Sequence, residues 1–555
     1  MRRLHLAVSM ACLLPGVVLA GDVTGLVNAR VHTGEDGWPV RTTLAWDAEG
    51  KLLDTGGAAD AAALEKKFPG ITLVDARGRD VVPGLIDAHG HLMNLGFALL
   101  RADLVDATSK EDVIARLKAF EATLPEGAWL LGRGWDQNDW PGKQFPTAAD
   151  LDAAFPDRPV WLERVDGHAG WANSAAMRAA KRELGGDWQP DGGRIMREDG
   201  RATGVFIDTA SALIDEVVPA PDAALREQAL ERALAAAVKH GLTGVHDMGV
   251  SMADLKLMRD FANADRLPLR IRAYADGDSA ALAALCRVGA AFEHPKGRLA
   301  MRGVKFYVDG ALGSRGAALL EDYSDEPGHR GLLVTEPAAY AAAVQKARDC
   351  GVQPASHAIG DRGNRIVLDT YEKVLGDAAG SDHRWRVEHA QVVAPADIPR
   401  FATLKLIASM QPTHATSDMP WAEARVGKAR LEGAYAWQRF RAAGVRLALG
   451  SDFPVESVDP RLGLYASVTR ADRDGMPAGG WLPDQKLTPE QALAGFTADA
   501  AYAAFDEKTL GKLVPGYRAD FVILGGDPLT IAPAALPTLD VVSTWVDGKP
   551  VYEKK

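Results

Sequence analysis

VVPGLIDAHGHL, residues 81–92, is the stretch of sequence that decides the fold. Its two apolar pairs, VV and LI, predict a short strand that is buried on both faces, as in a parallel sheet. His89 and His91 stand at the C-terminal end of this strand. Side chains at positions i and i+2 of a strand point to the same face, so the two imidazoles are expected to converge. On its own, this pair fits half of a metal site or two ordinary polar residues equally well.

Seven further apolar runs of strand length follow in the chain. Most are separated from the next by a segment long enough for a helix. They lie at 244–249, 269–274, 304–310, 353–358, 385–390, 407–412 and 446–453. Eight alternations of buried strand and helix are typical of a closed parallel barrel. The predicted fold class is therefore α/β, a (β/α)8 TIM-like barrel.

Three parts of the chain depart from this alternation. Residues 22–82, and residues 486–555 after an initial helix, contain short β-type runs separated by turns. Because chain termini commonly lie close together, the two parts are expected to form one small β-sandwich domain. The barrel is expected over residues 83–485, with a long insertion after strand 1, at about 103–232, that could cap a site.

The first 20 residues predict a secretory signal peptide. Arg2 and Arg3 form a basic start, an apolar segment follows, and Ala20 is a small residue at the expected cleavage point. An uncleaved membrane anchor is the alternative, but the apolar segment is short and is interrupted by Pro15 and Gly16. The expected location is therefore periplasmic or secreted, with no stable membrane insertion after cleavage.

Composition and cysteine content limit the possible functions. The 555 residues are 47% hydrophobic and 25% charged, which are ordinary globular values, and the formal net charge of −11 argues against a nucleic-acid surface. Cys286 and Cys350 remain after cleavage, and no Cys-x-x-Cys pair is present to hold structural zinc. Export permits a disulfide, but two free buried thiols are the expected state.

Polar residues stand at the C-terminal ends of several predicted strands. His89 and His91 end strand one, and the other members are His357 on strand five, His389 on strand six and Asp452 on strand eight. In a barrel of this kind the active site lies at that face, and nitrogen and carboxylate ligands without thiolates suit zinc, with manganese, nickel or cobalt as alternatives. A lone histidine at a strand end is usually a hydrogen-bonding residue, but four at matching ends favour a metal site.

Lys305 lies within the apolar run of strand four. A charged and unpaired lysine at such a position would be costly. The side chain is therefore expected to pair with an acid such as Asp452, to lose its proton, or to be chemically modified.

At this point the sequence resembles the metal-dependent amidohydrolase superfamily, in the branch called amidohydrolase family 3 and typified by N-substituted formamide deformylase. The resemblance covers nearly the whole chain after residue 20. It is carried by the segments PGLIDAHGH (83–91), GRGWD (132–136), DGH (166–168), VKFYVDGALGSR (304–315), SHAIGD (356–361), EH (388–389) and GSDFP (450–454).

The resemblance implies roles for these residues. His89 and His91 would hold one metal ion and His357 and His389 a second. Lys305, carboxylated by CO₂, would bridge the two ions. Asp452 would bind the first ion and act as general base on a metal-activated water that attacks the scissile carbonyl. Sites with a single metal ion also occur in the superfamily.

Other residues are weaker candidates for contact with the substrate. His168, from the insertion, could hydrogen-bond the substrate or its oxyanion as a catalytic residue, or could be a structural turn residue. The candidates for substrate binding are Trp135, Asp136, Trp171, Arg315 and Gln411, which could equally be packing residues or form internal pairs. His246 could support the ligands from behind, and His414 could face the pocket.

The predicted activity is hydrolysis of a carbon–nitrogen bond, most simply a non-peptide amide, in a small molecule. One alternative is a deaminase of the same superfamily, which typically lacks the lysine of strand four. Another is a catalytically dead barrel that binds a small molecule. The expected cofactor is one or two zinc ions, and the expected partners are the amide substrate and a second copy of the chain in a homodimer, with no nucleic acid.

Overall fold

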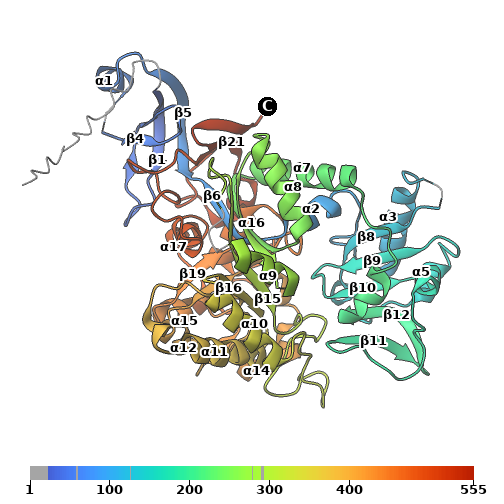
Figure 1. Ribbon diagram of the computed structural model, residues 1–555. Coiled ribbons are helices and arrows are strands. Elements are labelled where there is room, and N and C mark those ends of the chain that lie inside the picture. The colour runs from blue at the N-terminus through green and yellow to red at the C-terminus, as the bar shows by residue number, and fades with distance from the viewer. Residues whose placement is uncertain (1–22, 58–59, 126, 278, 289–292) are drawn as a thin grey trace, which may run out of the picture.

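The computed structural model describes residues 23–57, 60–125, 127–277, 279–288 and 293–555. Their strands form three sheets: a parallel barrel in the centre, a small sheet beside one end of it, and a third sheet that projects from the opposite side (Figure 1). The predicted signal peptide lies outside the described residues. Within those residues, every helix is too short or too polar to cross a membrane.

The central sheet has eight parallel strands in chain order. They are β6 (Leu85–Gly90), β13 (Leu242–Val250), β14 (Arg270–Asp276), β15 (Leu299–Tyr307), β16 (Gln353–Ala358), β17 (Arg386–His389), β18 (Ile407–Met410) and β19 (Arg446–Leu449). The first and last strands meet through a parallel bridge between Gly90 and Phe453, and His91 N donates to Phe453 O over 2.9 Å. The prediction of a TIM-like barrel is confirmed.

Helices follow the strands and cover the outside of the barrel. They are α2 (Leu92–Ala98), α7 (Ala223–Lys239), α8 (Met252–Asn263), α9 (Ser279–Val288), α10 (Pro337–Asp349), α11 (Asp361–Leu375), α12 (Ile398–Thr403), α13 (Pro412–Asp418), α14 (Ala422–Arg430), α15 (Trp437–Ala442), α16 (Pro460–Thr469), α17 (Pro489–Gly495) and α18 (Ala498–Ala503). In α11 the buried residues Val367, Leu368, Tyr371 and Val374 recur at helical spacing, which directs one stripe of the helix onto the core.

The small sheet joins the two ends of the sequence. Its order is β22-β21-β20-β5-β1-β3-β4, with β2 paired to β1. These strands are β1 (Thr24–His32), β2 (Val40–Arg41), β3 (Leu44–Trp46), β4 (Leu52–Thr55), β5 (Thr72–Pro83), β20 (Phe521–Leu524), β21 (Val541–Val546) and β22 (Lys549–Glu553); α1 (Ala61–Lys67) follows β4. Since these strands form one hydrogen-bonded sheet, the two packed sheets of a sandwich stay a prediction.

The stretch 81–92 is divided between two sheets, which corrects the prediction of one continuous strand. Val81 and Val82 belong to β5 and pair with β20, whereas the barrel strand β6 starts at Leu85. Gly84 marks the change of sheet: a Cβ at this position would lie only 2.2 Å from Thr243 Oγ1. The backbone therefore passes against β13 at a point where a side chain would not fit.

The insertion is a sheet with its own core. Its order is β11-β12-β10-β9-β8-β7, built from β7 (Ala102–Asp103), β8 (Leu130–Trp135), β9 (Val160–Arg164), β10 (Ala169–Ala172), β11 (Gly193–Glu198) and β12 (Arg201–Asp208). The helices α3 (Lys110–Glu121), α4 (Ala148–Asp152), α5 (Ser174–Ala179) and α6 (Ala212–Asp215) complete it. The barrel resumes earlier than residue 232, because Leu230 and Leu234 of α7 pack in the main core.

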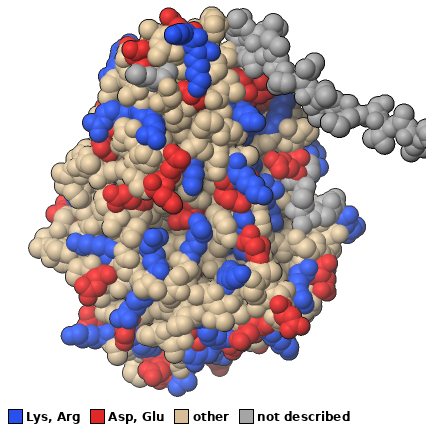
Figure 2. Space-filling view, turned by 90° about the vertical axis from the view of Figure 1, so that its left-hand side faces the viewer, with Lys and Arg blue, Asp and Glu red and all other residues tan. Residues whose placement is uncertain are grey.

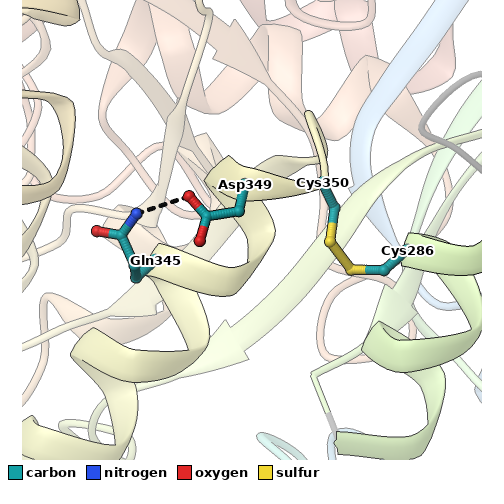
Figure 3. Close-up of a disulfide and its surroundings, with 4 residues drawn as sticks. All are labelled: Cys286, Gln345, Asp349 and Cys350. Atoms are coloured by element: carbon teal, nitrogen blue, oxygen red, sulfur yellow. Dashed lines mark hydrogen bonds between the residues drawn. A yellow bond between two sulfur atoms is a disulfide. The ribbon is translucent and has the colours of Figure 1, made fainter.

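Cys286 and Cys350 form a disulfide, which corrects the expectation of two free thiols. Cys286 lies in α9 and Cys350 directly follows α10, and their Cα atoms are 5.1 Å apart (Figure 3). Consecutive helices of a barrel lie side by side, and this proximity is what the spacing of 64 residues in the sequence does not show. Next to the disulfide, Gln345 donates to Asp349 across one turn of α10.

The face shown in Figure 2 carries basic and acidic side chains that are interspersed, with no broad area of one sign.

Candidate metal centre

The six residues predicted to hold metal lie together at the C-terminal end of the barrel. Five of them are His89 at the end of β6, Lys305 within β15, His357 on β16, His389 at the end of β17 and Asp452 just after β19. The sixth, His91, directly precedes α2 rather than lying on β6. The barrel thus places side chains that are hundreds of residues apart around one point.

The distances between these side chains are short. Asp452 Oδ1 lies 2.9 Å from His91 Nε2 and 3.4 Å from His89 Nε2, and Lys305 Nζ lies 3.1 Å from His89 Nε2. Ring centroids are 4.7 Å apart for His89 and His389 and 4.5 Å apart for His357 and His389. Potential ligand atoms of His89, His389 and Asp452 all lie within 4.8 Å of one another.

The imidazoles are held from behind by hydrogen bonds at Nδ1. His89 donates to Glu388 Oε2 (2.6 Å), His91 to Met248 O (2.8 Å) and His389 to Gln411 Oε1 (2.9 Å). Such bonds fix the tautomer and the orientation of a ligating histidine. Gln411, a candidate for substrate binding, accepts a hydrogen bond from the candidate ligand His389 in this structure.

Glu388 and Arg386 form a support that the sequence reasoning did not assign. Arg386 donates to both carboxylate oxygens of Glu388, over 2.7 and 3.0 Å, and both side chains are fully buried inside the barrel. Burial raises the pKa of Glu388, but the charge of Arg386 and the bond from His89 outweigh it and lower that pKa. His246 lies behind the candidate ligands, where its Nδ1 accepts from Arg386 over 3.0 Å.

The protonation states suit a metal site. Burial lowers the pKa of His89 to about 4 and holds the pKa values of His357 and His389 well below the usual range, so these imidazoles are neutral near pH 7. For Asp452, burial raises the pKa, but the neighbouring His89 and the bonds from His414 and His91 outweigh it and keep that pKa low. Neutral imidazoles and an ionised carboxylate are the forms that bind cations.

Lys305 is buried, and burial lowers its pKa to about 8. An uncharged amine is thus accessible near neutral pH. One buried atom of the cluster, Nε2 of His357, has no hydrogen-bond partner among the described residues. A buried and unpaired imidazole nitrogen is costly unless something binds it. The cluster therefore fits a divalent metal.

The loop that carries Asp452 is fastened to the first barrel strand. Asp452 has φ +63°, a conformation that non-glycine residues rarely adopt, and its N–H donates to His89 O over 2.6 Å. Asp87 accepts from the Ser451 hydroxyl (2.6 Å) and from the backbone N–H groups of Ser451 and His89. These bonds hold the loop of Asp452 against β6, beside the candidate ligands His89 and His91.

A small cavity lies beside His389. It is lined by His389, Gln391, Met410, Gln411, His414, Tyr435 and Trp437. His414 faces Asp452 Oδ2 at 3.3 Å and Glu456 Oε1 at 3.1 Å. Burial lowers the pKa of His414, but the bonds to Asp452 and Glu456 outweigh it and raise that pKa to about 10.

His168 reaches the centre from the insertion. Its ring centroid is 5.4 Å from that of His357, and its Nδ1 donates to Asp208 Oδ1 over 2.7 Å. Burial lowers the pKa of His168, but the bond to Asp208 and its charge outweigh burial and raise that pKa to about 9. The insertion thus contributes a histidine at the mouth of the barrel.

Four of the candidates for substrate binding have partners within the protein. Trp135 and Trp171 are fully buried in the core of the insertion, where their indole N–H groups donate to Leu162 O and Thr147 O. Asp136 pairs with the buried Arg164, and Arg315 pairs with Asp325 over 3.0 Å. Tryptophan spacing alone could not distinguish the core of the insertion from the wall of a pocket.

Comparison with known proteins identifies the family. The model of the amidohydrolase family matches residues 72–552. The chain belongs to this family. YtcJ of Bacillus subtilis (strain 168), named as an amidohydrolase, is 33% identical over 538 residues, which cover 96% of this chain and 98% of that protein. The N-substituted formamide deformylase of Arthrobacter pascens is 28% identical, with 95% of this chain and 98% of that protein covered.

A solved structure supports the same conclusion. A metal-dependent hydrolase from Pyrococcus horikoshii OT3 matches with a TM-score of 0.75 and 28% identity, over 92% of this chain and 99% of that one. The present amidohydrolase is therefore an enzyme, a hydrolase that works with a divalent metal.

Proposed function

We propose that this amidohydrolase cleaves the carbon–nitrogen bond of a small, non-peptide amide. The observation that carries the proposal is the gathering of four histidines, Lys305 and Asp452 at the mouth of the barrel, where the pKa values of His89, His357 and His389 are lowered so that these three imidazoles are in the neutral form that a metal requires. The similarity to an N-substituted formamide deformylase favours formamides as the first substrates to test.

The donor set of imidazole and carboxylate groups suits one or two zinc ions. A metal ion held there would polarise the scissile carbonyl and lower the pKa of water. The ligands in the proposal are His89, His91, His357, His389 and Asp452, with Lys305 in a modified form.

Lys305 is proposed to react with CO₂. The neutral amine attacks the carbon of CO₂, a nitrogen–carbon bond forms and one proton is released, which leaves an anionic carbamate. Because burial lowers the pKa of Lys305 to about 8, the reactive amine is populated without a large cost. A carbamate would place a negative charge among groups that hold cations, and this supports the modification.

Asp452 is proposed as general base and then general acid. Its low pKa keeps it ionised, and it lies against His89 and His91. It takes a proton from the attacking water as the oxygen–carbon bond forms, and gives that proton to the nitrogen as the carbon–nitrogen bond breaks. The products are a carboxylic acid and an amine.

The test of the activity is a screen of the zinc-loaded protein against N-substituted formamides and other small amides. We expect equal amounts of amine and carboxylate to be released. Release of ammonia from an amidine or aminopurine, without amide cleavage, would favour the deaminase. A lack of turnover together with a lack of bound metal would favour a binding protein on an inactive barrel.

Lys305→Ala tests the lysine directly. We expect this variant to lose metal and activity, with partial rescue of both by a short carboxylic acid such as propionate, because the acid can replace the missing anionic oxygen ligand. Metal content is measured by elemental analysis after gel filtration. Lys296→Ala, at an exposed lysine paired with Asp265, is the control and should keep full metal content. Normal metal content in Lys305→Ala would show that the lysine is not a ligand.

Export is proposed as well. The signal peptide over residues 1–20 lies outside the described residues, and the disulfide supports an oxidising compartment. Cell fractionation with sequencing of the mature N-terminus tests it: recovery of the full-length chain in the cytoplasm would contradict export. Sedimentation of the same sample measures whether the homodimer forms.

A further inference from the structure

Asp208, the last residue of β12, holds His168 in two ways. Its carboxylate accepts from His168 Nδ1 over 2.7 Å, and its backbone N–H donates to His168 O over 2.9 Å. The Asp208 side chain is buried, with 2% of its surface exposed. The backbone and the imidazole of His168 are therefore both tied to one residue of the insertion.

The carboxylate of Asp208 lies against bare backbone of the barrel. A Cβ on Gly310 would be 2.6 Å from Asp208 Oδ2, and a Cβ on Gly316 would be 2.5 Å from the same atom. We call these two residues the glycine notch. They belong to the loop that follows β15, the strand of Lys305. Only residues without side chains allow the insertion to approach this closely.

Two features indicate that this contact is not ordinary packing. Asp208 has φ +48° and ψ −126°, a backbone conformation that is unfavourable for a residue with a side chain. Its Oδ2 is buried and has no hydrogen-bond partner among the described residues. Strain and an unpaired carboxylate oxygen are retained where the surrounding structure forces them, and such positions often serve a site.

The result of this contact is the position of His168. Its ring lies beside that of His357, and 22% of its side chain is exposed. Because Nδ1 is bonded to Asp208, Nε2 is the nitrogen left to meet a substrate. No hydrogen bond to this Nε2 is found in the part of the chain that the structure describes.

We propose that Asp208 is a positioning residue that acts through His168, with the glycine notch setting its place against the barrel. His168 would contact the amide at the metal centre, so this role rests on the proposed function. The insertion would then complete the substrate site, and not only cover it.

A double-mutant cycle separates positioning from a general structural role. His168→Ala, Asp208→Ala and the double variant are compared by kcat and KM on the amide that the screen turns over best. We expect each single variant to lose about 10- to 100-fold in kcat/KM, as a misplaced contact does. The double variant should be no worse than His168→Ala. A further loss of the same factor in the double variant would overturn the proposal.

Gly310→Ala tests the glycine notch and leaves the side chains of Asp208 and His168 in place. The three nearest atoms to its added Cβ all belong to the Asp208 carboxylate. We therefore expect the loss in kcat/KM seen for Asp208→Ala, with unchanged metal content, and no additional loss once Asp208 is alanine. The control is Gly380→Ala, where no atom lies within 4 Å of the added Cβ, and its kcat/KM should be unchanged. Equal kcat/KM for Gly310→Ala and the control would show that the glycine notch does not set the position of Asp208.

Proton NMR provides a readout that needs no substrate. The His168 Nδ1–H signal, shifted downfield by its carboxylate acceptor, is assigned by its absence in His168→Ala. It should be lost in Asp208→Ala and retained, with less shift, in Asp208→Asn, whose amide oxygen can still accept. An unchanged signal in Asp208→Ala would overturn the positioning role. If no amide is turned over, the proposed function fails while this measurement still decides the contact.

Discussion

At the scale of single residues, the candidate metal centre is held in place by buried charged side chains, whose pairing can be seen in the structure but only inferred from the sequence. Arg386 and Glu388 are two residues apart on β17 and face the barrel interior, and Glu388 fixes His89. Charged residues in an apolar strand must be paired, so the pattern Arg-x-Glu-His could have revealed the support. No sequence pattern around Asp208 indicates its contacts, because His168 and the glycine notch lie next to it only in the folded chain.

Asp247 makes stability depend on pH. It is buried on β13 and accepts from Leu92 N over 2.9 Å. Burial raises its pKa to about 7, well above 3.8, so the folded chain favours the protonated form. The stability it contributes is fully present in acid and falls as pH rises from about 4 to about 7. Asp247→Asn keeps the acceptor and removes the charge.

We therefore expect Asp247→Asn to gain stability over the wild type as pH rises from 5 to 8, by on the order of a few kcal/mol. The measurement is urea unfolding of chelator-treated protein, so that no bound cation alters the carboxyl group. Asp260→Asn, at a mostly exposed acid, is the control and should show no such trend. If the free energies of unfolding of Asp247→Asn and the wild type differed by the same amount at every pH, the pKa of Asp247 would not be raised in the folded protein.

At the scale of elements, the positions of the barrel strands could be predicted from the sequence. The boundary between β5 and β6 and the disulfide between α9 and α10 could not. The apolar runs predict buried strands wherever they lie in the chain, and each of β13 to β19 overlaps its predicted run, although β15 begins five residues before the predicted start. The division between β5 and β6 was missed, because VVPGLI is apolar throughout and only tertiary pairing separates its halves. The disulfide was missed because it depends on which helices are neighbours.

The disulfide between α9 and α10 should stabilise the barrel. In the chain-entropy model, closing a loop of 64 residues contributes about 4 kcal/mol by restricting the unfolded chain. With Cys12 replaced by serine throughout, Cys286→Ser with Cys350→Ser should unfold at lower urea concentration than the parent. The parent in dithiothreitol should match this variant. Two reactive thiols in the unreduced, unfolded parent would show that the disulfide does not form.

At the scale of the whole molecule, one buried arginine joins the barrel to the small sheet. Arg270 of β14 donates to both oxygens of Asp520, over 2.7 and 2.9 Å, and to Asp547, over 2.5 Å. Arg298, which directly precedes β15 of the barrel, also pairs with Asp547. The chain's last strands are thereby attached to the barrel by ion pairs that water hardly reaches.

Removing one partner of this connection should be costly. We expect Arg270→Met to lower the free energy of unfolding by about 3–5 kcal/mol, because it leaves Asp520 buried without its cation. Chemical denaturation measures the loss. Lys256→Met, which removes an exposed pair with Asp260, should change stability by less than about 0.5 kcal/mol. Equal losses in the free energy of unfolding for the two substitutions would show that the ion pairs of Arg270 do not stabilise the fold.

The pairing of β5 with β20 has a consequence for the newly made polypeptide. β1 and β5 lie in the first part of the chain and are synthesised early, whereas β20, the other neighbour of β5, is synthesised only when nearly all of the chain has been made. Until then one side of β5 exposes unpaired peptide groups, an edge to which other nascent chains can add. We expect the growing chain to need a chaperone that covers this edge, until its final strands emerge.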